Sequence, residues 1–270
     1  MKFRLYIVLI ILMLASSCGQ YEKLLKSTDF DLKKAKAKEY YDAGQYVKTT
    51  ELLAQILPRF RATEEAEELN WMNAKAFFGM KDYFMAGSYF KSFINDFPFG
   101  KHAEEANFMA AMCDYNIAPR SELDQENTKN AIEGFKIFTN RFPASPKVEE
   151  ANKLIKELEE KLVDKSYLSA KLYYDMKQYK AAVVALNNSL KEYADTKYRE
   201  EMMFLKLRSL YLYADLSLPQ KQKERYQETL DDYYSFMEEY PKSTYSRDVN
   251  NIFLKTNKYL KAGIPDSGVK

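Results

Sequence analysis

The pattern of apolar and polar positions along the chain predicts helices arranged as a repeat. A ten-residue cassette of Ala-Lys-x-aromatic-aromatic, a short break and a Tyr occurs at 37–46, 74–83 and 170–179. In each copy the alanine and first aromatic residue lie three positions apart, as do the lysine and second aromatic residue, so a helix presents two adjacent stripes. Apolar residues return at helical spacing after the second break, at Ala86 and Phe90. The pattern therefore predicts helical hairpins.

Helix-ending signals predict how many hairpins there are. Each signal combines an aromatic residue with small polar capping residues, and an acidic first turn follows it. The signals lie at Arg59-Phe60, Asp96-Phe97-Pro98, Arg141-Phe142-Pro143, Glu192-Tyr193 and Glu239-Tyr240-Pro241. The first two cassettes are 37 residues apart, which is within the range of tetratricopeptide-like hairpins. We predict an all-α fold, an α-solenoid of about five such hairpins, with repeats 1–2 over 31–100 and repeats 3–5 over 101–262.

The later repeats are longer because of three additions. Segment 117–128 with Pro119 is expected to split the third hairpin, and segment 216–223 with Pro219 the fifth. Segment 148–164 has apolar residues at a 3.6 period, which predicts a long helix joining the third and fourth units.

The N-terminus has the layout of a secretory signal peptide over residues 1–17. Basic residues precede a short apolar run, which is too short for a permanent membrane span, and small residues follow it. Cys18 comes next and resembles a bacterial lipobox cysteine, although Ala15 stands where Leu is more usual. We expect Cys18 to be lipidated and to anchor the body at a membrane; ordinary secretion and an uncleaved anchor are the alternatives. Residues 18–30 would be a tether and 263–270 a flexible tail.

Charge and composition narrow the function classes. Removing Lys2 and Arg4 from 41 Lys and Arg residues leaves 39, against 39 Asp and Glu, so we expect no nucleic-acid partner. His102 is the only histidine, and lipidation of Cys18 leaves Cys113 without a disulfide partner. These residues cannot build a zinc site or a histidine-activated nucleophile. We predict a protein that is not an enzyme, with no metal and no cofactor besides the lipid on Cys18, in which Cys113 is a buried apolar residue.

The lysine and second aromatic stripe is the candidate binding surface. First helices of stacked hairpins line one face, where rings beside amines would suit an extended peptide with an aromatic side chain and a carboxylate. The alternative is that Trp71 and Phe78 pack against the neighbouring hairpin and the lysines are solvated. The candidates for this peptide groove are Lys38, Tyr41, Trp71, Lys75, Phe78 and Tyr174.

The mature chain as a whole resembles the BamD family, the lipoproteins of the outer-membrane β-barrel assembly machinery. The resemblance combines the lipobox cysteine with the repeats and their inserts. It is carried by residues 21–27 after Cys18, by Leu123-Asp124-Gln125 with Thr128, and by segments 161–174 and 221–226. The Lys-Leu-Leu-Lys-Ser opening resembles the Bacteroidetes branch of that family.

The resemblance implies an outer-membrane lipid anchor and a body in the periplasm. It further implies that the C-terminal half docks the POTRA domains of a BamA-like β-barrel subunit, with Asp124, Gln125 and Thr128 as candidates, and that N-terminal units meet targeting strands of unfolded outer-membrane proteins. Other accessory lipoproteins are expected partners. The alternative is a general periplasmic tetratricopeptide scaffold lipoprotein, for example one that organises cell-wall enzymes, which would not need the Asp124-Gln125 insert.

Overall fold

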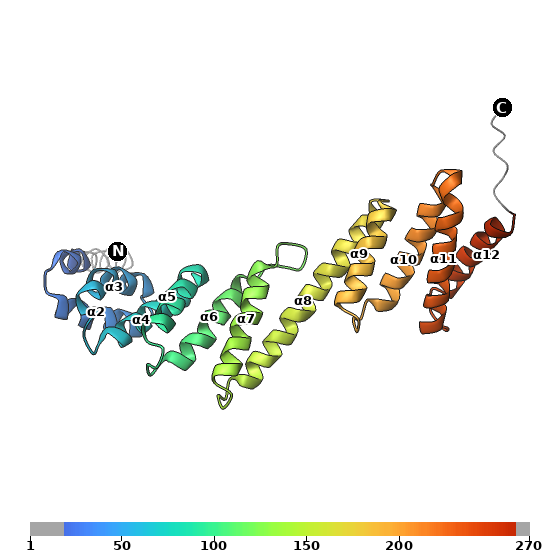
Figure 1. The fold of residues 1–270 in the computed structure, drawn as a ribbon. Coiled ribbons are helices and arrows are strands. Elements are labelled where there is room, and N and C mark those ends of the chain that lie inside the picture. The colour runs from blue at the N-terminus through green and yellow to red at the C-terminus, as the bar shows by residue number, and fades with distance from the viewer. Residues whose placement is uncertain (1–18, 263–270) are drawn as a thin grey trace, which may run out of the picture. The chain divides into compact units, whose positions relative to one another are not determined.

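The computed structural model describes residues 19–262, which form helices and their connections and contain no strand (Figure 1). The helices, in chain order, are α2 (Phe30–Asp42), α3 (Tyr46–Phe60), α4 (Ala66–Gly79), α5 (Tyr83–Asp96), α6 (Ala103–Ile117), α7 (Glu126–Arg141), α8 (Val148–Asp175), α9 (Tyr179–Glu192), α10 (Arg199–Asp215), α11 (Pro219–Glu239) and α12 (Ser246–Ala262). The chain divides into two compact units. The first holds the chain to Pro119 and 125–158, and the second holds 120–124 and the chain from Glu159 onward.

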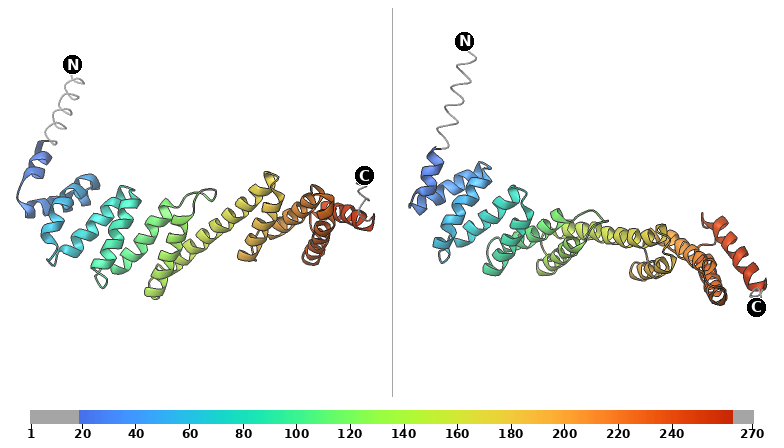
Figure 2. Two further views of the ribbon diagram at one scale, coloured as in Figure 1. Left: turned by 45° about the horizontal axis from the view of Figure 1, so that its top comes forward. Right: turned by 90° about the horizontal axis from the view of Figure 1, so that it is seen from above.

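The helices pair as the sequence predicts. Neighbours in the chain pack as antiparallel hairpins, α2 with α3, α4 with α5 and α6 with α7 in the first unit, and α10 with α11 in the second (Figures 1 and 2). The C-terminal part of α8 pairs with α9, where the Ser166 hydroxyl donates to Ser189 Oγ at 2.8 Å, so the described residues contain five hairpins, and α12 packs on the last one. Each hairpin ends at its aromatic signal. The all-α solenoid-type fold of tetratricopeptide-like hairpins is confirmed.

The cassettes form one turn geometry three times. The residue two positions before the turn tyrosine has a positive φ in every copy, at Gly44 (70°), Lys81 (62°) and Lys177 (60°). Its backbone N–H donates to the second aromatic residue's carbonyl, as Lys81 does to Phe78 at 2.9 Å. The second aromatic ring then packs on the turn tyrosine, with ring centroids 5.8, 5.2 and 6.1 Å apart in chain order. The stripe expected to face a partner therefore partly stabilises its own turn.

Two of these turns hold a lysine where glycine is preferred, because a Cβ disfavours the left-handed conformation. Lys81→Gly and Lys177→Gly are each expected to raise the free energy of unfolding by up to about 1 kcal/mol. Gly44→Ala should lower it by a similar amount, because Gly44 has open space around it and backbone strain is the only cost. Urea unfolding followed by circular dichroism measures both. Lys81→Ala is the control, and a gain equal to that of Lys81→Gly would contradict a backbone origin.

The additions to the later repeats differ in kind. The third hairpin has a long connection, since α6 ends at Ile117 and α7 begins at Glu126. The fifth hairpin turns within the expected segment 216–223, but only over 216–218, because α11 already begins at Pro219, a residue that suits the first turn of a helix. Extra helix length accounts for that unit. The joining helix is confirmed and is longer than expected, because α8 continues through the third cassette over 28 residues.

The residues after the signal segment belong to the folded body. Residues 19–26 are helical, and Leu24 is buried with Leu52 and Ile56 of α3. Tyr21 donates its hydroxyl to Glu51 Oε2 at 2.5 Å. A separate tether over 18–30 is therefore wrong for these residues, because an apolar face on the segment packs against the first hairpin. Residues 1–17, Cys18 and the tail 263–270 lie outside the described residues.

Cys113 of α6 is fully buried, and burial raises the pKa of its thiol to about 12. The expectation of a small apolar core residue is confirmed.

Candidate functional site

The first helices contain a contact that recurs at each junction between hairpins. Its first member lies three residues before a buried alanine or leucine of the first helix. Its second member directly precedes the first helix of the next hairpin, or α12. We call these pairs the junction contacts: Lys34 and Glu65 (Nζ to Oε1, 2.8 Å), Trp71 and His102 (rings, 4.6 Å), Phe108 and Lys147 (Nζ to ring, 4.5 Å), Tyr167 and Tyr198 (rings, 4.0 Å), and Phe204 and Tyr245 (rings, 4.3 Å).

Trp71 is a junction residue and not an open contact surface. Its side chain is 7% exposed and lies against Phe90 and Phe93 of α5, with ring centroids 5.5 and 5.7 Å away. His102 stacks on it at an interplanar angle of 3°. His102 Nε2 is 2.9 Å from Glu68 Oε2. The expectation that Trp71 lines a peptide groove is wrong, because the next hairpin covers its ring.

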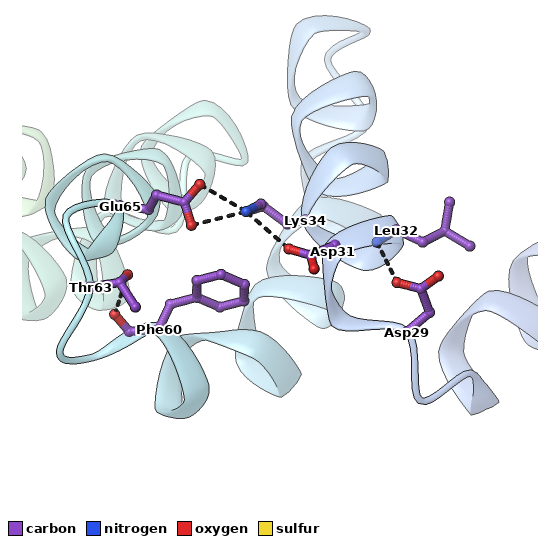
Figure 3. Close-up of polar contacts among 7 residues, drawn as sticks. All are labelled: Asp29, Asp31, Leu32, Lys34, Phe60, Thr63 and Glu65. Carbon is purple, nitrogen blue, oxygen red and sulfur yellow. Dashed lines mark hydrogen bonds and ion pairs between the residues drawn. The ribbon is translucent and has the colours of Figure 1, made fainter.

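The lysines of this face are engaged with carboxylates. Lys75 Nζ lies 3.0 Å from Glu105 Oε1 and 5.3 Å from the Trp71 ring. Lys34 Nζ donates to both Glu65 oxygens, at 2.8 and 2.9 Å, and pairs with Asp31 on its own helix (Figure 3). From sequence alone, glutamates at helix starts are expected to be solvated. Glu65 and Glu105 instead form ion pairs with lysines of the preceding hairpin. Lys75 is thus paired with Glu105 in this structure, and its contact with a peptide carboxylate stays a prediction.

The other groove candidates fall into two groups. Lys38 is exposed, and Tyr41 and Phe78 are half-buried on the first unit. Tyr174 belongs to the second unit, where Arg208 lies 5.8 Å from its ring. The structure therefore does not bring the six candidates into one site. In the third cassette the first aromatic residue, Tyr173, is exposed, whereas the second, Tyr174, is half-buried. The second aromatic residue was the one expected to be open to a partner.

The insert candidates have a structural role in part. Gln125 and Thr128 are buried, and the Thr128 hydroxyl donates to Gln125 Oε1 at 2.7 Å at the start of α7. The expectation that these two side chains contact a docked partner directly is wrong, because both are buried. Asp124 is exposed. Nearby, Lys165 of α8 donates to the backbone carbonyl of Glu122 at 2.7 Å, so the insert is held on α8.

An exposed apolar surface on α8 was not identified from sequence. Leu168 and Leu172 of α8, and Met176 directly after its end, are 37%, 57% and 59% exposed and follow one another at a spacing of four residues. Tyr173 of α8 and Val184 of α9 are exposed in the same unit. We call Leu168, Leu172 and Met176 the α8 stripe. The spacing is readable in the sequence, but exposure depends on which helices cover α8.

A search of curated proteins gave no match. Among solved structures, the TPR2AB domain of yeast Sti1 in complex with a pHSP90 peptide is 15% identical, with a TM-score of 0.37 and coverage of 84% of this chain and 98% of that one. A kinesin light chain with nearly identical TPR-like repeats from Podospora anserina is 12% identical, with a TM-score of 0.34 and coverage of 79% and 96%.

The family comparison covers most of the described body. The model of a family described as "YfiO: Outer membrane lipoprotein" matches residues 33–227. This range runs from the first hairpin into α11 and includes both compact units. None of the helices described here is long and apolar enough to cross a bilayer. Because the match spans well over half of its length, the chain belongs to the YfiO family of outer membrane lipoproteins.

Proposed function

We propose that this protein is a non-catalytic scaffold of the β-barrel assembly machinery. In this proposal the lipid on Cys18 holds it at the outer membrane with its body in the periplasm, and it helps to insert β-barrel proteins into that membrane. The observation that carries the proposal is the family match over residues 33–227. The BamD-like segments of the sequence supply the link to barrel assembly.

The state of the reactive side chains supports a role without catalysis. His102 is stacked on Trp71 and paired with Glu68, so it forms part of a hairpin junction. Cys113 is buried, and its raised pKa keeps the thiol protonated at neutral pH. The histidine and the cysteine of the described residues are thus both used in packing.

Partner docking is proposed for the second unit. The α8 stripe is an apolar surface next to the insert that contains exposed Asp124, and apolar surfaces of this kind are typical of protein interfaces. We propose that it receives a POTRA domain of a BamA-like β-barrel subunit. For unfolded outer-membrane proteins, the remaining candidates on the first unit are Lys38, Tyr41 and Phe78, where an exposed amine lies in the same stripe as two half-buried rings.

Capture from solubilised membranes tests the proposal. The full-length chain, tagged at its C-terminus and expressed in the organism that encodes it, is recovered with mild detergent after crosslinking. We expect a β-barrel protein with POTRA domains and further lipoproteins in amounts comparable to the bait. Cys18→Ser is the control, and it should leave the membrane fraction. Recovery of cell-wall enzymes without a barrel protein would contradict barrel assembly and support the general periplasmic scaffold.

A further inference from the structure

Two exposed apolar side chains mark one edge of the first unit. Val47 and Phe84, which are 59% and 74% exposed, each follow the turn tyrosine at the second position of α3 and α5. The two turns adjoin, since the Tyr46 ring lies against Gly79 at the end of α4. Met80 lines a shallow hollow together with Tyr46 and Val47. We call Val47, Met80 and Phe84 the turn edge.

These side chains are not required by their own hairpins. The start of α5 is capped by Asp82, whose carboxylate accepts the Met85 N–H at 3.1 Å. Phe84 projects beyond this cap and is mostly exposed. The Phe84 ring and the Val47 side chain therefore leave apolar area at the turn edge that a contact outside the first unit could cover.

The chain enters the folded body beside this edge. Tyr21 lies against the first turns of α3, where its hydroxyl donates to the Lys48 carbonyl at 3.3 Å and to Glu51. Further along, the Leu25 carbonyl accepts from Lys33 Nζ, which also donates to Gln55 Oε1 in the middle of α3. The segment thus runs from the start of α3 toward its end. Gly19 is about 3 Å along the helix axis from Tyr21, on the side of the turn edge.

This direction identifies the contact partner. Cys18 is joined covalently to Gly19, and consecutive Cα atoms are about 3.8 Å apart. Acyl chains on Cys18 would therefore tie the bilayer to the end of the segment that lies nearest the start of α3. Exposed Lys81 of the second turn adds a long cationic side chain that can reach lipid phosphates while its stem covers apolar surface. A lipid headgroup region suits this combination of an aromatic ring, aliphatic side chains and an amine.

We propose that the turn edge of the first two hairpins lies in the headgroup region of the membrane that holds the Cys18 lipid. The inference rests on the proposed lipidation and extends it, because the acyl chains and the turn edge together fix how the first unit meets the membrane. A single flexible anchor would leave that orientation free.

A fluorescent label at each end of α5 tests the inference. The full-length lipidated protein is reconstituted in phosphatidylethanolamine and phosphatidylglycerol vesicles with the NBD dye on Phe84→Cys. The matched control is Phe99→Cys, which is 96% exposed just past the other end of the helix, about 20 Å away. Buried Cys113 stays unlabelled under native conditions. We expect emission at position 84 to rise severalfold on vesicle binding and doxyl lipids to quench it at least twofold, with no change at position 99.

The outcomes separate the inference from the proposed function. Equal emission at both positions in protein that floats with the vesicles overturns the turn-edge contact and leaves the lipid anchor intact. Protein that does not float, with an unacylated N-terminal peptide in mass spectrometry, overturns both. A response at position 84 in detergent alone that follows protein concentration identifies a second copy as the occupant and overturns the membrane contact.

Discussion

Replacing Trp71 with alanine is expected to lower the free energy of unfolding of the first unit by about 3–5 kcal/mol. The indole fills the space between α5 and the start of α6, against Phe90, Phe93 and His102. Its removal leaves a cavity between hairpins. It also removes the ring that lies against the Lys75 amine, which pairs with Glu105. Stability of stacked repeats depends on contacts between neighbours, so a junction side chain has a large effect.

The measurement is urea unfolding followed by circular dichroism, since Trp71 is the only tryptophan and the variant loses that fluorescence signal. Trp71→Phe is the matched control. It keeps a ring against Phe90 and Phe93 and should lose less than half as much stability. A loss below about 1 kcal/mol for Trp71→Ala, together with weaker binding of a peptide ending in an aromatic residue and a free carboxylate, would contradict the structural role and restore the groove interpretation.

Local sequence determined the hairpins well. Turn residues, helix-ending aromatic residues and apolar spacing act within a few residues of one another, so the end of α5 at Asp96 and the turn at Lys81 followed from the pattern. The single helix α8 was only partly predicted, because the joining segment and the third cassette each have a complete helical pattern. Nothing in either pattern shows that the two helices are continuous.

The junction contacts could not be predicted in the same way. Each joins residues about 30 to 40 positions apart, and the chemistry changes from an ion pair at Lys34 and Glu65 to stacked rings at Trp71 and His102. The contacts occupy equivalent positions in successive hairpins, but the residue types differ from one junction to the next. The sequence therefore shows no repeated residue pattern at these positions. Trp71 was therefore assigned to a partner surface, although the next hairpin covers it. Thr128 is a docking candidate only through the family resemblance, whereas its hydroxyl donates to Gln125 at the start of α7.

Replacing Leu172 and Met176 together with glutamate is expected to reduce capture of the proposed barrel subunit at least tenfold. Both side chains are more than half exposed, so the change should leave the second unit folded. At an interface the new carboxylates would lose their hydration without a cation to pair with. The free-energy cost of burying these charges adds to the loss of the apolar contact and is larger than it. Quantitative capture from crosslinked membranes, normalised to the bait, gives the ratio.

Leu254→Glu is the matched control, because Leu254 is an exposed leucine of α12 in the same unit and lies outside the α8 stripe. It should leave capture unchanged, and all variants should keep the circular dichroism spectrum of the parent protein. Equal loss in the control would show a general effect of surface charge. Full capture by the double variant would remove the α8 stripe as the docking surface. The proposed membrane contact concerns only the first unit, so the label at position 84 should respond in the double variant as it does in the parent protein.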